Sequence, residues 1–167
     1  MPILFSGSSD RMMYQSKHMS LNIALIQARE ALMTHFRPLL NDVGLTDQQW
    51  RILRLLAENG TMDFQDLART ACILRPSLTG ILTRLEKMNL LMRLKPASDQ
   101  RRVFLKLTRH GEQTYADFVS QIDRNYDVIE TLMPKEKIDQ LHLLLAELAT
   151  YNTPQKLDQK IVVNKIE

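Results

Sequence analysis

Basic residues are concentrated in one part of the sequence, between Arg69 and Arg109. This segment contains ten Lys and Arg residues against two acids, Glu86 and Asp99, a net charge of +8. The whole chain of 167 residues carries only +3, so the rest of it sums to −5. A phosphate backbone attracts such a segment, because each contact neutralises a phosphate and releases a counterion. A merely solvated surface would mix Glu with Lys, so the segment predicts a polyanion-binding surface.

A predicted helix over residues 75–88 presents this surface. Five apolar residues recur at the spacing of an amphipathic helix and predict one buried stripe: Leu74, Leu78, Ile81, Leu82 and Leu85. The opposite face is small, hydroxyl-bearing and basic, with Pro76, Thr79, Gly80, Thr83 and Lys87 between Arg75 and Arg84. Such a face can approach a polyanion closely, because no bulky side chain stands in the way.

Two short strands follow that helix. Residues 91–95 and 102–107 are predicted to be strands, the second with polar and apolar residues alternating at period two. The polar segment 96–101 lies between them as the tip of a β-hairpin.

The remaining elements are predicted mainly from helix-start signals. Ser20 caps a helix over about residues 20–43, with a kink at Pro38. Thr46 and Gln49 form a capping box that opens a helix to about residue 58. Asp63 caps a short helix over about residues 64–71, and the turn 72–74 leads into the basic helix. Two further helices begin after Thr108 and at Pro134. The fold class is therefore mainly α: a winged helix-turn-helix with a small β-hairpin wing and a helical dimerisation region from the N- and C-terminal helices.

This pattern divides the chain into three parts. Residues 1–19 are predicted to be a flexible N-terminal arm and residues 152–167 a flexible C-terminal tail. The domain between them, 20–151, combines a winged helix at about 46–108 with dimerisation helices at about 20–43 and 109–151. The outer helices carry more apolar surface than a small winged helix can cover, which predicts a homodimer. Twofold symmetry would set two recognition helices one DNA turn apart, roughly 34–36 Å, on a pseudo-palindromic operator in double-stranded DNA.

Composition excludes several other classes of protein. No apolar run approaches the roughly 20 residues that span a bilayer, so no membrane association is expected. One cysteine among 167 residues fits a reducing cytosol, and we expect a cytoplasmic protein. The four histidines, His18, His35, His110 and His142, lack metal-ligand spacing, and no Gly-rich phosphate loop or nucleophile–base pair is evident. We therefore expect no enzyme, no cofactor and no metal.

Three local strings resemble the MarR-type transcriptional regulators over about residues 20–150. They are Leu45-Thr46 with Gln49-Trp50-Arg51-Ile52-Leu53, then Leu78 to Glu86, then Asp99-Gln100-Arg101-Arg102. Residues 71–84, with Arg29-Glu30-Ala31 and Phe36-Arg37-Pro38, resemble most closely the branch that represses homoprotocatechuate (3,4-dihydroxyphenylacetate) degradation. The resemblance implies a repressor of an aromatic-acid catabolic operon, released from its operator by an aromatic carboxylate.

The resemblance also implies roles for individual residues at the DNA. Six residues of the recognition helix would enter or border the major groove: Arg75, Pro76, Ser77, Thr79, Thr83 and Arg84. At the wing, Arg101 would enter the minor groove while Asp99 braces it by a salt bridge. The predicted DNA-binding set also includes Lys87, Lys95, Gln100 and Arg102.

Arg29 is the candidate effector-binding residue, because it lies within an apolar stripe of the first helix. A buried cation must find an anion. That anion is either a structural acid of the other subunit or the last helices, or the carboxylate of an effector of the 3,4-dihydroxyphenylacetate or 4-hydroxyphenylacetate type. The family's known effector position, between the dimerisation helices and the winged helix, implies the second. His35 would bond a ring hydroxyl, Trp50 would form core and pocket wall, and Ser20 would add a polar contact.

Two alternatives differ in how the protein would work. Cys72 would be a peroxide-sensing thiol, although its apolar neighbours predict burial, which makes a thiol inert. A non-regulatory architectural DNA-binding protein would need the basic segment but not a buried Arg29.

Overall fold

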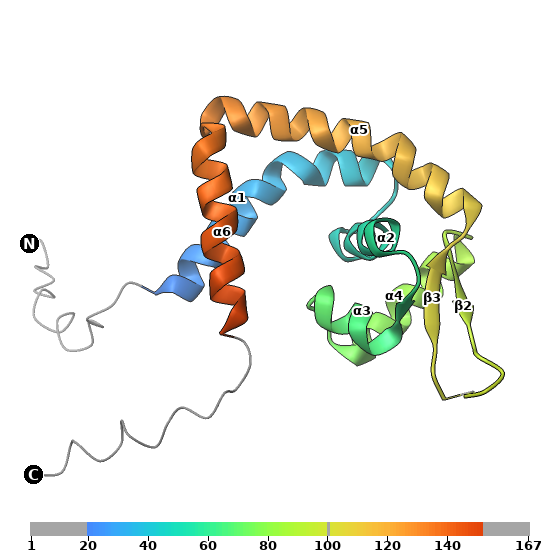
Figure 1. Cartoon of the computed structure of the whole chain (residues 1–167). Coiled ribbons are helices and arrows are strands. Elements are labelled where there is room, and N and C mark those ends of the chain that lie inside the picture. Colours follow the sequence, from blue (N-terminus) through green and yellow to red (C-terminus); the bar gives the residue numbers. More distant parts are fainter. Residues whose placement is uncertain (1–19, 100, 152–167) are drawn as a thin grey trace, which may run out of the picture.

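The computed structural model describes residues 20–99 and 101–151, and Figure 1 shows how their elements are arranged. In chain order these are α1 (Leu21–Asp42), α2 (Asp47–Asn59), β1 (Met62–Asp63), α3 (Phe64–Thr70), α4 (Arg75–Lys87), β2 (Leu91–Leu94), β3 (Phe104–Leu107), α5 (Arg109–Leu132) and α6 (Lys135–Thr150). The prediction of a mainly helical winged helix-turn-helix is confirmed. The predicted arm 1–19, the predicted tail 152–167 and Gln100 lie outside the described residues.

Side-chain caps fix where the helices begin. The hydroxyls of Ser20 and Thr108 accept hydrogen bonds from backbone N–H groups of α1 and α5, and Asp63 does the same for α3. Thr46 and Gln49 form both bonds of the predicted capping box at α2. Each cap satisfies a donor that the helix itself leaves open, so these polar residues set the element boundaries.

The wing is part of a three-stranded antiparallel sheet in the order β1-β3-β2. Leu91 pairs with Leu107 and Leu94 with Phe104, as expected for a hairpin. On the other side of β3, Met62 pairs with Leu105, so the short extended segment before α3 becomes a third strand. The sequence analysis did not predict this third strand, because two residues carry no periodic signal.

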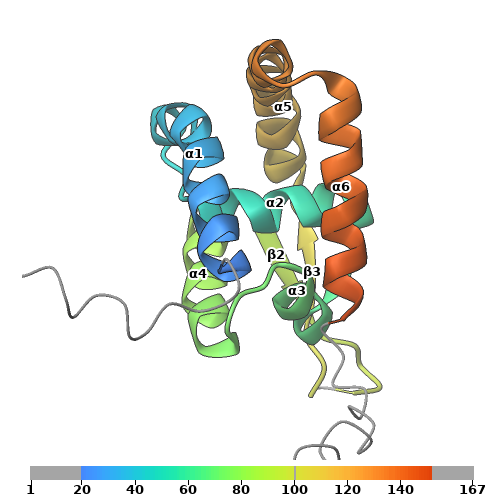
Figure 2. The same ribbon diagram turned by 90° about the vertical axis from the view of Figure 1, so that its left-hand side faces the viewer.

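The core lies between α2, α3, α4, the sheet and the first half of α5. Its fully buried side chains include Ile52, Leu53, Leu67, Leu78, Leu82, Leu85 and Leu105. Helices α1 and α5 run side by side above α2, and Phe36 of α1 contacts the ring of Tyr126 on α5 at 5.1 Å. Helix α6 descends from the far end of α5 (Figures 1 and 2), and Figure 1 shows that it stands apart from the winged helix. None of the α6 residues is buried.

Helix α1 continues through Pro38, which was expected to kink it. Figure 1 shows the helix changing direction upstream of its C-terminal end. A proline ring has no N–H to give to the carbonyl four residues earlier, here that of Thr34. One turn upstream, the Thr34 hydroxyl donates to the Glu30 carbonyl at 3.0 Å, a type of bond that often bends a helix. Among residues 20–99 and 101–151 no helix is both long enough and apolar enough to cross a membrane.

Candidate nucleic-acid interface and ligand region

Helix α4 separates its two faces as the sequence predicts. Leu78, Ile81, Leu82 and Leu85 are buried and hold the helix against the core. The opposite face is exposed and carries all seven of the recognition-helix residues assigned to DNA: Arg75, Pro76, Ser77, Thr79, Thr83, Arg84 and Lys87. The hydroxyls of Thr79 and Thr83 donate to backbone carbonyls one turn earlier, at 3.3 and 3.0 Å. Each hydroxyl therefore offers a partner only its oxygen lone pairs, and at Thr83 one of them already accepts a hydrogen bond from Arg93 at 3.1 Å.

The turn before α4 differs from the prediction at two residues. Leu74 was expected in the buried stripe, but it is 78% exposed because it is the N-cap, with φ −61° and ψ 136°, and precedes the helical period. Cys72 was expected to be buried, but its backbone has φ +52° and its side chain is exposed. Burial therefore does not protect the Cys72 thiol. Periodicity predicted both residues wrongly because it applies only inside a regular element.

The basic residues divide into paired and free cations. Arg102 binds Asp63 at 3.3 Å and lies over the Phe104 ring at 4.8 Å. Arg69 pairs with Asp66, and Arg75 donates to the side chain of Gln65. By contrast, four of the cations assigned to DNA form neither an ion pair nor a hydrogen bond through their side chains with any other residue in 20–99 and 101–151: Arg84, Lys87, Lys95 and Arg101. These four, on α4 and the wing, can neutralise phosphates without breaking an existing pair.

At the wing tip, Asp99 acts on the backbone and not on a guanidinium. Its carboxylate accepts a hydrogen bond from the backbone N–H of Arg101 at 3.0 Å, and its carbonyl accepts one from Arg102 at 3.2 Å. Within the described residues, the predicted salt bridge between Asp99 and Arg101 is not formed. An aspartate bonded two residues ahead stabilises a turn. Asp99 therefore fixes the direction in which the chain leaves the tip, and with it the position of Arg101.

Arg29 is not the isolated buried cation that the sequence predicts. Its side chain is 48% exposed and contacts Glu30 at 2.9 Å and Asp47 at 2.5 Å. Glu30 also binds Arg37, and the hydrogen bond to Arg37 is the main cause of a lowered pKa of the Glu30 carboxyl. The prediction failed because it treated the whole stripe as buried, whereas Ile26 and Leu32 are exposed in the single chain. The acids that balance Arg29 lie in its own chain, on α1 and α2.

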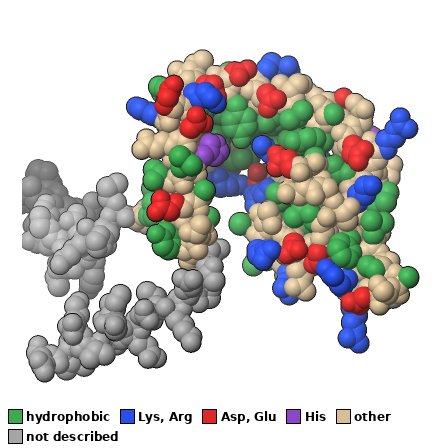
Figure 3. All heavy atoms as spheres, in the orientation of Figure 1, with side chains coloured by type: hydrophobic (Ala, Val, Ile, Leu, Met, Phe, Trp, Pro, Cys, Tyr) green, Lys and Arg blue, Asp and Glu red, His purple; other side chains and the backbone are tan. Residues whose placement is uncertain are grey.

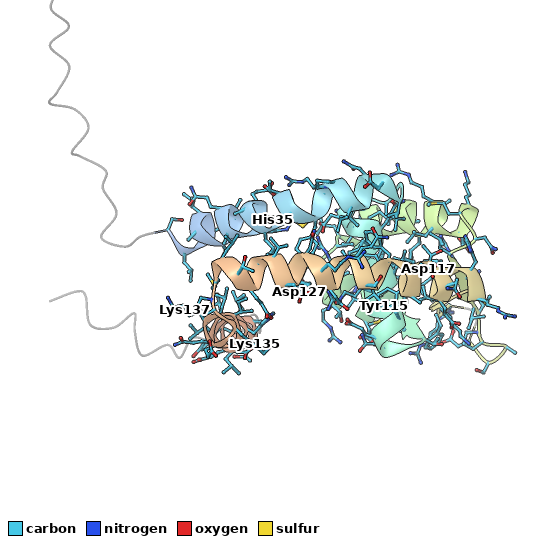
Figure 4. All side chains as sticks on the ribbon, turned by 90° about the horizontal axis from the view of Figure 1, so that it is seen from above. His35, Tyr115, Asp117, Asp127, Lys135 and Lys137 are labelled. Carbon is cyan, nitrogen blue, oxygen red and sulfur yellow. The ribbon has the colours of Figure 1, made fainter. Side chains whose placement is uncertain are left out.

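The other three candidate effector residues do not converge with Arg29 in one chain. Ser20 uses its hydroxyl to cap α1, and His35 is exposed, with its backbone carbonyl bonded by Asn125 of α5. Fifteen residues separate Ser20 from His35, about 22 Å along a helix, which is too far for one small aromatic acid to bridge. Trp50 is 8% exposed and belongs to the core. In the view of Figure 4, His35 on α1 lies well away from Tyr115 on α5.

An aromatic cluster lies between α1, α2 and α5, and it comprises Phe36, Trp50, Tyr115, Phe118 and Tyr126. Trp50 stacks on Tyr115, with ring centroids 5.3 Å apart, and meets Phe118 edge-on at 4.8 Å. The pKa of the Tyr115 hydroxyl is raised, first by burial and then by the nearby Glu58 carboxylate. Phe36, Trp50 and Phe118 are buried, so it is the partly buried rings of Tyr115 and Tyr126 on which an aromatic ligand can stack.

Arg54 is the cation of this cluster, and the sequence analysis overlooked it. It follows Trp50 by one helical turn and donates to Glu58 at 2.7 Å. Burial would lower the pKa of Arg54, but hydrogen bonding and charge from Glu58, together with Tyr126, raise it above its ordinary value. The overlooked signal is the spacing of four residues between Trp50 and Arg54, which puts an aromatic ring and a guanidinium on the same helical face.

The space-filling view shows a hollow beside these elements. In Figure 3 the molecule is hollowed between α6 and the winged helix, with hydrophobic side chains in the roof above it.

The described part of the chain contains no group of three or more His, Cys, Asp or Glu side chains placed to hold a metal ion.

Comparison with known proteins agrees with this architecture. Residues 45–103 match the model of the MarR family. The chain is 67% identical to the HTH-type transcriptional regulator FarR of Neisseria gonorrhoeae, over 81% of this chain and 92% of that protein. It is 53% identical to the homoprotocatechuate degradative operon repressor of Escherichia coli, over 83% and 95%. The crystal structure of NadR in complex with 4-hydroxyphenylacetate superposes with a TM-score of 0.75 at 67% identity, covering 83% of this chain and 98% of that one. This chain belongs to the MarR family of transcriptional regulators.

Proposed function

We propose that two copies of the chain repress an aromatic-acid catabolic operon by binding a pseudo-palindromic operator, and that a hydroxyphenylacetate releases them. The observation that carries the DNA-binding part is the set of four free cations, Arg84, Lys87, Lys95 and Arg101, on α4 and the wing. The protein would act in the cytoplasm, where its DNA is. The effector class is supported by the relatives: NadR binds 4-hydroxyphenylacetate, and the Escherichia coli protein represses a homoprotocatechuate operon.

Within this proposal, the effector stacks on the aromatic cluster and its carboxylate pairs with Arg54. Arg29 already contacts two carboxylates, so a ligand there would have to displace Glu30 or Asp47. Arg54 has one acidic partner, Glu58, interacts with Tyr126, and follows Trp50 by one turn of α2. A guanidinium next to aromatic rings can bind both parts of a hydroxyphenylacetate. Its N–H groups pair with the carboxylate, and the neighbouring rings stack on the phenyl ring.

The decisive experiment compares Arg54→Gln with Arg29→Gln. Operator DNA selected by the wild-type protein from a random pool is titrated by fluorescence anisotropy, with and without 4-hydroxyphenylacetate or 3,4-dihydroxyphenylacetate. The Arg54→Gln protein should keep operator binding and need about ten- to a hundredfold more effector for release, because a hydrogen bond to a charged group contributes roughly 1.5–3 kcal/mol. The Arg29→Gln protein should respond like wild type.

Matched controls separate the parts of the proposal. 4-Hydroxyphenylethanol keeps the ring but lacks the carboxylate, and it should release DNA from neither protein. If the response to the effector is lost in Arg29→Gln and kept in Arg54→Gln, the carboxylate of the effector is bound by Arg29 and not by Arg54. Equal affinity for a scrambled duplex at physiological salt would overturn operator recognition and favour the architectural alternative.

The exposure of Cys72 favours one second candidate function, a peroxide-controlled repressor. In that case mild peroxide would lower the operator affinity of the wild type and leave Cys72→Ser unaffected. A repressor controlled only by the aromatic acid keeps its operator affinity under the same treatment, so the two candidates give opposite results in one assay.

A further inference from the structure

Leu74 has the most exposed large apolar side chain in the described part of the chain, at 78%. It is the N-cap of α4, a position where Ser, Thr, Asn or Asp normally caps the first N–H groups, and here no side chain does so. Polar residues cap the starts of α1, α2, α3 and α5. Helix α6, which follows Pro134, also starts without a side-chain cap, but only α4 begins with a leucine directed to solvent where a hydroxyl or carboxylate would stabilise the free protein.

The surroundings of Leu74 indicate what covers it. It lies between two arginines, Arg69 and Arg75, and directly precedes the exposed polar face of α4. The exposed apolar surface expected to bury in a dimer is on α1 and α6, separate from the helix-turn-helix. A polyanion fits this neighbourhood, whereas an apolar protein partner would have to desolvate both arginines to reach one leucine.

The position of Leu74 in the helix specifies which part of the DNA it meets. In helix-turn-helix proteins the N-terminal residues of the recognition helix contact base edges in the major groove. The only apolar group on those edges is the 5-methyl group of thymine. Arginine and threonine side chains on the same helix read polar groups, so a leucine at its start can add only an apolar contact.

We propose that Leu74 is a specificity-determining residue that packs against the 5-methyl group of a thymine in each operator half-site. This inference rests on the proposed binding of operator DNA. It assigns to Leu74 a base contact, and it accounts for an exposed leucine at a helix start that lacks a cap.

Replacing thymine by uracil tests the contact, because uracil differs from thymine only in lacking the methyl group. Each thymine of the selected operator is replaced in turn, and the dissociation constant is measured. For the wild type, one replacement per half-site should weaken binding roughly fourfold, the value expected for one buried methyl group. The Leu74→Ala protein should bind the unmodified operator more weakly and be insensitive to that replacement.

Two further variants keep the result interpretable. Leu74→Ser supplies the missing cap, so its melting temperature should equal or exceed that of wild type while its thymine sensitivity is lost. Leu94→Ala removes another exposed leucine, on β2, and should keep the wild-type pattern. The proposal fails if uracil weakens binding equally in the wild type and Leu74→Ala, since the effects would then be independent. A wild type that binds no selected operator would instead overturn the DNA-binding function itself.

Discussion

Gly111, in the first turn of α5, marks a close approach between the start of this helix and the backbone just before β2. A Cβ atom at this position would lie 1.9 Å from the carbonyl oxygen of Leu90 and 2.9 Å from its carbon. Both atoms belong to the backbone just before β2, and the same carbonyl accepts the N–H of Thr108 at 3.1 Å. No side-chain rotation can make room, so only the absence of a side chain lets α5 start here.

The Gly111→Ala substitution should lower the free energy of unfolding by roughly 1–3 kcal/mol or more, the usual cost of overpacking. Gly80→Ala is the matched control. Nothing lies within 4 Å of a Cβ atom at Gly80, and alanine favours a helix by up to about 1 kcal/mol over glycine. Urea unfolding at equal protein concentrations should therefore give opposite signs for the two substitutions. Equal stability of Gly111→Ala and wild type would show that α5 can shift.

Arg93 joins two elements, the β2 strand of the wing and the recognition helix α4. Its Nη2 donates to the hydroxyl of Thr83 at 3.1 Å, and its Nε lies 2.9 Å from the Glu86 carboxylate. That Nε is shielded from water but misaligned for a hydrogen bond, so the contact with Glu86 is an ion pair. Together with the Arg102–Asp63 pair, these contacts fix the wing relative to the helix-turn-helix.

We expect Arg93→Met to weaken operator binding more than the loss of one positive charge explains. Lys106→Met is the charge-matched control, since Lys106 faces Met92 across the strands and is exposed. Stability should change by at most about 1 kcal/mol, because the pair is partly exposed to solvent. Anisotropy titrations of both variants measure the difference. Equal losses of affinity would mean that Arg93 contributes charge only and does not position the wing.

The elements themselves were predictable where a local signal sets a boundary. Thr46 with Gln49, Asp63 and Thr108 placed the helix starts because capping depends on neighbours only a few residues away. The failures have a different cause. Leu74 lies one residue outside the helix whose period suggested its burial, and the exposure of Arg29 depends on what covers the first half of α1. Arg54 acquires its surroundings only when α5 brings Tyr126 to it, a contact between residues 72 positions apart.

At the scale of the whole molecule, the outer helices leave apolar surface uncovered. Leu141, Leu144, Leu145 and Leu148 of α6 are all exposed, as are Leu21, Ile23 and Ile26 of α1. Figure 1 shows α6 standing apart from the winged helix. Surface of this kind is unusual on a monomer and typical of an oligomer interface. It supports the proposal that two copies associate through these helices.

The double substitution Leu144→Glu and Leu148→Glu should therefore give a monomer in sedimentation velocity at micromolar concentration. The control, Gln140→Glu, adds negative charge to the exposed surface of α6 without removing a leucine. The monomer should also lose roughly a hundredfold or more in operator affinity, because only one half-site can be engaged at a time. A double variant that still sediments as a dimer would place the interface elsewhere.

The pairing of Met62 with Leu105 joins two points of the chain that are 43 residues apart, and all the residues assigned to DNA lie between them. Helices α3 and α4, strand β2 and the wing tip all lie inside this closed loop. Breaking the pairing of β1 with β3 would open this loop and loosen all of these elements together. We therefore expect them to unfold locally as one cooperative unit. The proposed major-groove and minor-groove contacts should then be gained and lost together, because the residues assigned to them lie within this one unit.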